Sequence, residues 1–372
     1  MLQKKTPLLC IAFLLAGSLF SCKEEAPTKV ALDFGTYVGN QADDLIDNTS
    51  QLRWIKRSKV DQLIREKDSF LLLVHGAADE CTCFTQWHNT VLAPYIKRNK
   101  LLVYAITLKE FETGTDYLGV LRISGSDTLC VFQSGTLRYQ KDTSDQQASF
   151  VKDYAAFSTW MKERTENPKI YYVSFEILDE FYGDFDPFTI YFGRDNCPDC
   201  AYLKNALLKD YLHTKKIVDD RFLYVDFDAV RPSKDDEDYE AKMVTYAQTK
   251  AKYGLTETED SPAGMGEGVF PTIYYVRPNG KDYTGEVIES AGVFFNEMLG
   301  KDGKISGRYF TKERYDAAKE TYLSYVADDA TLTSKWIEGD ILKADTPDRH
   351  EALKPYEAPF FNALLNYCVL DQ

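Results

Sequence analysis

The sequence predicts an α/β protein with two similar three-layer units, each a central mixed sheet with helices on both faces, plus a helical C-terminal extension. Three observations lead to this prediction. Short apolar strands, such as residues 70–74 and 188–192, alternate with helical segments, and such strands need both faces of their sheet covered. The order of strands and helices repeats on either side of a boundary at Asn167-Pro168. The 372 residues also suffice for two domains of ordinary size.

The first unit is predicted over residues 51–166. Its expected elements, in chain order, are a helix over 58–67, a strand over 70–74, a helix over 84–97, a strand over 101–106, a hairpin of strands 128–132 and 136–139, and a helix over 150–164. The hairpin strands are joined by a Ser134-Gly135 turn, so they should be antiparallel neighbours.

The second unit is predicted over residues 167–300, and the helical extension over 301–372. The expected elements of the second unit are strands over 170–175 and 188–192, a helix from Cys197 to about Leu212, a strand over 222–226, a helix over 233–253, and strands over 271–276 and 283–288. The helix over 233–253 should begin with a capping box, because Ser233 precedes Asp236 by three residues.

The N-terminus predicts export. Two lysines precede an apolar run over residues 7–20, which is too short to span a bilayer comfortably and is typical of a signal peptide. Residues 19–22 (Leu-Phe-Ser-Cys) resemble the lipobox of bacterial lipoproteins. The resemblance implies a signal peptide over 1–21, lipidation of Cys22, and a tether over 22–50 outside the cytoplasm, at the cell membrane. An ordinary secretory signal is the alternative.

The chain is acidic, with a formal net charge of −14. Removal of residues 1–21, which hold two lysines and no acids, would change this charge to −16. An acidic chain repels nucleic acid and anionic head groups, so we exclude nucleic-acid binding and expect no basic membrane-docking face. No later stretch is apolar for 18 residues, so no transmembrane helix is expected.

The eight cysteines indicate redox chemistry more than a structural scaffold. Beyond Cys10 and Cys22, six remain, in two close pairs and two singles: Cys81 with Cys83, Cys197 with Cys200, and the singles Cys130 and Cys368. Six are too few for a disulfide scaffold in a chain this long, whereas close pairs outside the cytoplasm suggest thiol chemistry.

The Cys197-Pro198-Asp199-Cys200 dithiol stands where a predicted strand gives way to a helix. With Pro198 at the first helical position, Cys197 falls at the N-cap. Backbone N–H groups and the helix dipole then favour the Cys197 thiolate. Cys200 lies one turn further on, where it can close a disulfide. This layout suits thiol–disulfide exchange, although a static structural disulfide and half of a zinc site are alternatives.

Residues 188–200 resemble the strand-loop-helix of the thioredoxin family, and Lys252-Tyr-Gly-Leu followed by Val269-Phe-Pro-Thr resembles its cis-proline segment. The resemblance covers roughly residues 170–299, and among relatives this range is similar to bacteriocin transport accessory proteins. It implies that Cys197 is the nucleophile, that Cys200 is the resolving thiol, and that Pro271 is a cis-proline facing them. The backbone around it, at Phe270, Pro271 and Thr272, would then bind an extended substrate segment.

The second unit departs from the thioredoxin pattern at three positions. Asn196 stands where many thioredoxins have tryptophan, Tyr191 stands where they bury an acid, and Asp199 opposes thiolate formation unless it points to solvent. These departures bear on the rate and the redox poise of the dithiol.

The first unit is expected to be a degenerate thioredoxin-like domain. Its Cys81-Thr82-Cys83 pair is one residue shorter than the usual spacing, and Asp127 stands at the cis-proline position. Three interpretations remain open: a second active dithiol, a relay for Cys197 and Cys200, and a retired site. The single cysteines are expected in the core, and His75 and His88, which flank the pair, are expected to be polar packing.

The function predicted from these observations is a membrane-anchored, extracytoplasmic thiol–disulfide oxidoreductase. Its partners would be exported protein thiols and disulfides and a membrane electron-transfer partner; no cofactor or metal is expected. The alternative is a non-catalytic surface lipoprotein that uses the fold to bind a protein or peptide, with the acidic residues 231–268 and the C-terminal extension as its binding surfaces.

Overall fold

The structure is a computed structural model, and it describes the residues that carry both predicted units. The described residues are 27–37, 52–76, 86–111, 117–125, 127–145, 147–184, 186–197, 200–201, 203–215, 222–255, 270–278, 286–292, 337–338, 341–342, 358 and 362. The predicted signal peptide, Cys22, the Cys81-Cys83 pair and Cys368 lie outside these residues. None of the described helices is long and apolar enough to cross a membrane.

The first lobe is built on a five-stranded sheet. Its strands, in the order in which they pair, are β3 (Leu52–Trp54), β5 (Val103–Thr107), β4 (Phe70–His75), β6 (Thr128–Gln133) and β7 (Thr136–Asp142). The first three are parallel to one another, β6 is antiparallel to β4, and β7 is antiparallel to β6. Every residue of β4 is buried, as the continuous apolar run predicts for a strand covered on both faces.

Helices cover both faces of this sheet. On one face lies α1 (Arg57–Arg65). On the other lie η2 (His88–Leu92), α3 (Ala93–Asn99), α5 (Ser149–Lys152) and α6 (Tyr154–Arg164). The last two replace the single helix expected over 150–164. They are separate because Asp153 adopts an extended conformation and its side chain caps α6, accepting from the Ala155 amide at 2.8 Å.

The second lobe repeats the strand order of the first. Its sheet is ordered β13 (Glu286–Gly292), β12 (Thr272–Arg277), β10 (Phe188–Gly193), β11 (Phe222–Asp226), β9 (Ile170–Tyr172) and β2 (Phe34–Thr36). Strands β9, β11 and β10 are parallel to one another, β12 is antiparallel to β10, and β13 is antiparallel to β12. From β9 to β13, the strands of the second sheet have the same order and directions as β3, β5, β4, β6 and β7 of the first. The predicted α/β class with two similar units is therefore confirmed.

Two helices of the second lobe differ from the sequence prediction. The strand expected over 170–175 ends at Tyr172, and α7 (Phe175–Gly183) follows, capped by the Ser174 hydroxyl, which accepts from the Ile177 amide at 3.3 Å. The helix expected from Ser233 begins later, as α10 (Tyr239–Lys252). The Ser233 amide does donate to the Asp236 carboxylate at 3.1 Å, but this contact closes a turn, so the capping-box prediction was wrong about where the helix begins.

The prediction of a tether over 22–50 was wrong for residues 27–37. Strand β1 (Val30–Ala31) pairs with β8 (Thr165–Glu166), and β2 pairs with β9. Val30 and Leu32 are almost fully buried. This N-terminal strap is anchored because its apolar side chains enter the core and its backbone completes two sheets, one of them the sheet of the second lobe.

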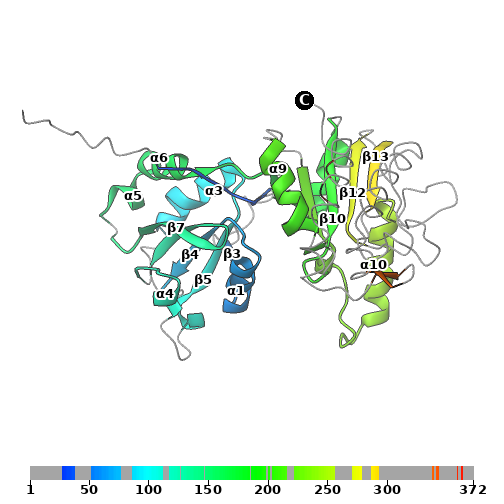
Figure 1. The fold of residues 1–372 in the computed structure, drawn as a ribbon, viewed down its shortest axis with the longest axis horizontal. Helices are drawn as coiled ribbons and strands as arrows, with labels where there is room; N and C mark the ends of the chain where they lie inside the picture. Colours follow the sequence, from blue (N-terminus) through cyan, green and yellow to red (C-terminus); the bar gives the residue numbers. More distant parts are fainter. Residues whose placement is uncertain are drawn as a thin grey trace, which may run out of the picture.

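Of three buried hydrophobic clusters among the described residues, one includes residues of both lobes. The helix of the second lobe that contains η4 (Leu203–Leu208) and α9 (Lys209–Lys215) packs one side on its own sheet, through Tyr191 and Tyr224, and presents the other to the first lobe. Leu72 and Tyr104 of the first sheet belong to the same buried cluster. In Figure 1, α9 accordingly lies between its own sheet and the first lobe. The helix that follows the dithiol is therefore buried on two sides.

Most of the predicted helical extension, residues 301–372, lies outside the described residues. Within it, β14 (Ile337–Glu338) and β15 (Ile341–Leu342) form a two-stranded antiparallel pair that the sequence did not suggest.

Candidate functional site

Cys197 lies at the start of a helix, as its sequence position predicts. Strand β10 ends at Gly193, and the chain turns so that the Cys197 amide donates to the Arg194 carbonyl at 3.3 Å. The Cys197 carbonyl accepts from the Ala201 amide at 2.9 Å, which is the first helical hydrogen bond. The Cys200 amide donates to the Cys197 sulfur at 3.4 Å. The sulfur thus occupies the N-cap position, where N–H groups stabilise a thiolate.

A cis-proline turn faces this sulfur. The Phe270–Pro271 peptide bond is cis, as the family resemblance implies. The antiparallel pairing of β10 with β12 joins Phe192 to Thr272, so the start of β12 lies beside the end of β10. The Cys197 thiol contacts the Phe270 carbonyl oxygen at 3.8 Å. The structure therefore brings together five of the residues that the sequence predicts for the site: the two cysteines and the segment 270–272.

The two sulfurs have different surroundings. Both cysteines are thiols in this structure; Cys197 is half-buried, whereas Cys200 is 2% exposed. Burial raises the pKa of the Cys200 thiol, and the adjacent Cys197 sulfur raises it further. This asymmetry is what the attacking and resolving roles require, because the thiolate is the nucleophile in disulfide exchange and must reach its substrate.

Tyr191 lies directly under the dithiol. It is fully buried in β10, and its hydroxyl donates to the Cys200 carbonyl at 3.1 Å. Burial raises the pKa of Tyr191 well above its ordinary value, and the charges of Cys200 and Cys197 raise it further. The phenol therefore keeps its proton and supports the first helical turn instead of serving as a base. The sequence identified this position as a departure from the family but did not predict the contact.

Two aspartates, at the last residue of β11 and two residues beyond it, hold the loop that precedes Cys197. Asp228 accepts from the Arg194 side chain at 2.8 Å and from the Asn196 amide at 2.8 Å. Asp226 accepts from the Asp195 amide at 3.3 Å, and its pKa is raised by burial and by the nearby Asp195 carboxylate. Sequence reasoning missed both residues. Their position at the end of a strand parallel to β10 was the available signal, because such ends meet at one edge of the sheet.

Asp195, two residues before Cys197, ties the loop to the first lobe. Its carboxylate lies 3.6 Å from Lys59 of α1, 3.7 Å from Arg53 of β3 and 3.8 Å from Lys204 of its own lobe. Burial alone would raise the pKa of Asp195, but these three cations together lower it. Asp195 is therefore a partly buried anion, and the first lobe supplies two of the cations that neutralise it.

The corresponding place in the first lobe holds a histidine–aspartate pair. Strands β4 and β6 pair Val74 with Thr128, as β10 and β12 pair Phe192 with Thr272. Asp127 therefore occupies the position of Pro271, as the sequence predicted, and His75 occupies that of Gly193. The His75 Nδ1 lies 2.7 Å from the Asp127 Oδ1. The sequence treated His75 as polar packing and did not predict this pair.

The single cysteine described in the first lobe belongs to the core. Cys130 is buried in β6, and burial raises its pKa to about 12. This confirms the prediction that it is a core residue. His88, also expected to be polar packing, is 1% exposed, and its Nδ1 lies 3.1 Å from the Asn89 side-chain oxygen.

Residues 175–294 match a family model described as a thioredoxin-like domain. Among curated proteins there is no match. The match lies within the range of the resemblance stated from the sequence and includes both cysteines and Pro271. The finer likeness to bacteriocin transport accessory proteins stays a prediction.

Several solved structures show a low similarity to this chain. The J-Trx1 fragment of ERdj5 is 12% identical with a TM-score of 0.24, over 32% of this chain and 52% of the fragment. A mutant thioredoxin of Halobacterium salinarum is 16% identical with a TM-score of 0.24, over 31% of this chain and 91% of that one. Form II of human ERp44 is 15% identical with a TM-score of 0.30, over 65% of this chain and 55% of that one. This chain thus spans about half the length of two of them, and likenesses at this level say nothing about its function.

Proposed function

Because residues 175–294 form a thioredoxin-like domain, we propose that the protein is a thiol–disulfide oxidoreductase in which Cys197 attacks and Cys200 resolves. One observation carries the proposal: the half-buried Cys197 sulfur accepts the Cys200 amide at the start of a helix, and it lies 3.8 Å from the carbonyl oxygen that precedes the cis-proline. A sulfur in such a place is favoured as a thiolate, and the turn beside it offers backbone for an extended substrate.

The exchange proceeds in two balanced steps. The Cys197 thiolate attacks one sulfur of a substrate disulfide, so that a mixed disulfide forms and the other substrate sulfur leaves as a thiolate that takes up a proton. Cys200 then loses its proton and attacks the Cys197 sulfur. The Cys197–Cys200 disulfide forms and the second substrate thiol is released, so two electrons have passed from the dithiol to the substrate. The reverse sequence oxidises a substrate dithiol.

We place this activity on the extracytoplasmic side of the bacterial cell membrane, with Cys22 lipidated. The support comes from the sequence, in the lipobox-like residues 19–22. Residues 1–26 lie outside the described residues. Cells fed labelled palmitate should label the protein, and a Cys22→Ser form should lose the label. Equal labelling of the two forms contradicts lipidation at Cys22.

The redox proposal is tested by trapping the thiol with iodoacetamide across a range of pH after mild reduction. We expect Cys197 to be alkylated well below the ordinary thiol pKa of about 8.5, while Cys200 stays protected by burial. A dithiol that resists mild reductant, or that reacts only at alkaline pH, favours the alternative function of binding a partner without catalysis.

A Cys200→Ser variant tests the assigned roles. Without a resolving thiol, the mixed disulfide between Cys197 and substrate should accumulate and can be isolated on non-reducing gels. The matched control is the double variant Cys197→Ser/Cys200→Ser, which should trap nothing. Adducts that persist in the double variant would show that another cysteine reacts. The reduction potential of the wild-type pair then gives the direction: a value near about −270 mV indicates a reductase, and one near about −120 mV an oxidase.

A further inference from the structure

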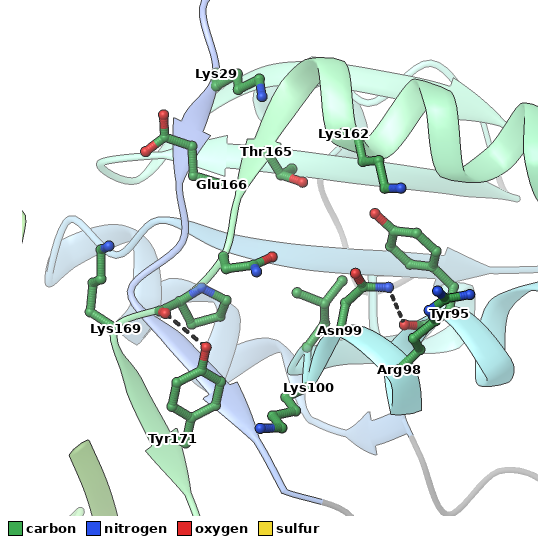
Figure 2. Close-up of a pocket in the computed structure, with 13 residues that line it drawn as sticks. Lys29, Tyr95, Arg98, Asn99, Lys100, Lys162, Thr165, Glu166, Lys169 and Tyr171 are labelled. Carbon is green, nitrogen blue, oxygen red and sulfur yellow. Dashed lines mark hydrogen bonds between the residues drawn. The ribbon is translucent and has the colours of Figure 1, made fainter. Parts of the chain in front are cut away.

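A pocket of about 640 Å³ opens where the two lobes join. Its walls come from the end of α3, the end of α6 and residues 165–169, which connect the lobes, and Lys29 of the N-terminal strap also lines it (Figure 2). Tyr95 and Tyr171, both 3% exposed, contribute to its lining. The site was not suggested by the sequence, because its residues come from three separate stretches of the chain, at residue 29, residues 95–101 and residues 162–171.

Cationic side chains dominate the lining of this pocket. Lys29, Arg98, Lys100, Lys162 and Lys169 line it, against the single carboxylate of Glu166. The pocket therefore has a formal charge of +4, while the whole chain has −14. Figure 2 shows that the cations come from opposite sides of the pocket. Like charges repel one another, and an anion bound among these side chains would reduce that repulsion.

Three of these cations, Lys29, Arg98 and Lys162, have no acidic partner among the described residues. All three are exposed to solvent. Lys100 is engaged with an aromatic residue: its ammonium donates to the Tyr37 hydroxyl at 3.0 Å and lies 4.4 Å from that ring's centroid. The first three cations are thus available to a ligand.

Neutral hydrogen-bonding groups complete the pocket. Burial raises the pKa of Tyr95 to about 12, with a further contribution from Tyr154, so the Tyr95 hydroxyl keeps its proton and can donate. The exposed side-chain amide of Asn167 also lines the pocket. A wall with one guanidinium, several ammonium groups and neutral donors suits oxygen anions that accept many hydrogen bonds.

The pocket is separate from the dithiol. It reaches the second sheet at Tyr171, in β9, whereas Cys197 follows the end of β10. Strands β9, β11 and β10 are parallel. Tyr171 pairs with Leu223, near the start of β11, whereas Gly193 pairs with Asp226, at its end. A ligand in the pocket would therefore lie toward the starting ends of these strands, whereas the attacking sulfur lies beyond their other ends.

We propose that this pocket binds a phosphate-bearing anion. A phosphate monoester carries about −1.5 to −2 charges at neutral pH and three acceptor oxygens, which matches a pocket that has several cations and neutral donors. Arg98 supplies a planar fork that can bind two phosphate oxygens at once, and the lysines act as point charges around it. The proposal does not depend on the redox activity.

Two sources can present a phosphate to these side chains: a soluble phosphate ester, and the head group of an anionic lipid, whose diester has less charge and fewer free oxygens than a monoester. Lys29 lies seven residues after Cys22, so an extended chain of about 3.3–3.6 Å per residue would keep it within roughly 25 Å of an anchored lipid. A head group is within reach if Cys22 is lipidated. The expectation from the sequence of no basic membrane-docking face rested on net charge, which does not reveal a local cluster.

The test is a matched pair of charge reversals in the full chain. Lys162→Glu changes a pocket cation, and Lys234→Glu makes the same change in net charge at an exposed lysine outside the pocket. Binding of inorganic pyrophosphate is measured by titration calorimetry, and binding to vesicles of phosphatidylglycerol with phosphatidylcholine is measured by sedimentation. We expect Lys162→Glu to weaken binding of at least one probe roughly tenfold or more, and Lys234→Glu to leave it close to wild type.

The outcomes separate the sources and decide the proposal. Lys162-dependent binding of pyrophosphate without vesicle binding indicates a soluble phosphate, and Lys162-dependent vesicle binding without pyrophosphate binding indicates a head group. Equal effects of the two reversals, or no binding of either probe, overturn the proposal. Lys162-dependent binding of polyglutamate alone also overturns it, because the site would then recognise carboxylates.

Discussion

A buried carboxylate between the lobes predicts a specific pH dependence of stability. Asp68, which joins α1 to β4, is 2% exposed and forms an ion pair with the Lys209 ammonium of α9. The same ammonium lies 3.5 Å from Asp33 of the N-terminal strap, whose other carboxylate oxygen lies 2.9 Å from the His213 ring. This cluster connects the strap and both lobes. Asp68→Asn removes its titration while keeping the side-chain shape.

The magnitude follows from the pKa of Asp68. Burial raises this pKa from 3.8 to about 6, although Lys209 and Lys204 act in the opposite direction. Between these pH values the native state binds more protons than the unfolded state. The contribution of Asp68 to the free energy of unfolding is therefore fully present below pH 3.8 and is lost as the pH rises through about 6. At 1.36 kcal/mol per pH unit the total loss is about 3 kcal/mol, of which about 2 kcal/mol falls between pH 4.5 and 7.5.

The assay is urea unfolding of the wild type and of Asp68→Asn at several pH values, followed by tryptophan fluorescence. The free energy of unfolding of the variant, relative to wild type, should rise by about 2 kcal/mol from pH 4.5 to 7.5. Asp61→Asn, which removes a carboxylate with a 42% exposed side chain from α1, controls for the lost charge. If the curves for Asp68→Asn and wild type stay parallel, Asp68 does not titrate as its burial requires.

Three further substitutions test other parts of the structure. Tyr191→Phe removes the hydrogen bond to the Cys200 carbonyl and should lower the free energy of unfolding by about 1 kcal/mol; an unchanged urea midpoint contradicts the contact. Gly35→Ala places a methyl group against a backbone oxygen and a tyrosine ring, so it should cost about 1–3 kcal/mol and expose the strap to proteolysis; an unchanged digestion pattern would show that the strap is not held there. Asp153→Ala removes the cap of α6 and should cost about 1 kcal/mol in thermal unfolding, whereas Asp153→Ser should retain most of it.

The elements that the sequence predicted well are those with a local signal. The apolar runs of β4 and β10 and the hairpin of β6 and β7 are visible in consecutive residues, and each lies where it was expected. The helix at Cys197 was found because a cysteine, a proline and a preceding strand together mark a helix start. The repeated order of these local signals was sufficient to predict two units of the same class.

The elements that were missed depend on distant partners or on a weak cap. Strands β1 and β2 contain two and three residues, and they exist because they pair with β8 and β9, more than 130 positions away. No local pattern distinguishes such strands from a polar tether. Helix α7 did carry a local signal, Ser174 before Glu176, but the strand predicted over 170–175 ran through it.

The candidate site was predicted in its sulfur chemistry but not in its support. The two cysteines and Pro271 were named from motif and resemblance, and the structure places them together. Arg53 and Lys59, which contact the loop before Cys197, come from the other lobe. Contacts of this kind follow from how two separately folded sheets pack, which the sequence pattern within each sheet does not specify.

The buried cluster that includes residues of both lobes suggests what the first lobe contributes. Its cis-proline position holds Asp127, whose carboxylate is paired with the His75 ring, where the second lobe has Pro271. Meanwhile, its sheet covers the helix that follows Cys200, and its cations neutralise Asp195 two residues before Cys197. Because both ends of the redox segment contact the first lobe, loosening that interface should alter the reactivity of Cys197 before it unfolds the second sheet. The first lobe then acts as a support for the redox segment, whether or not its own cysteines react.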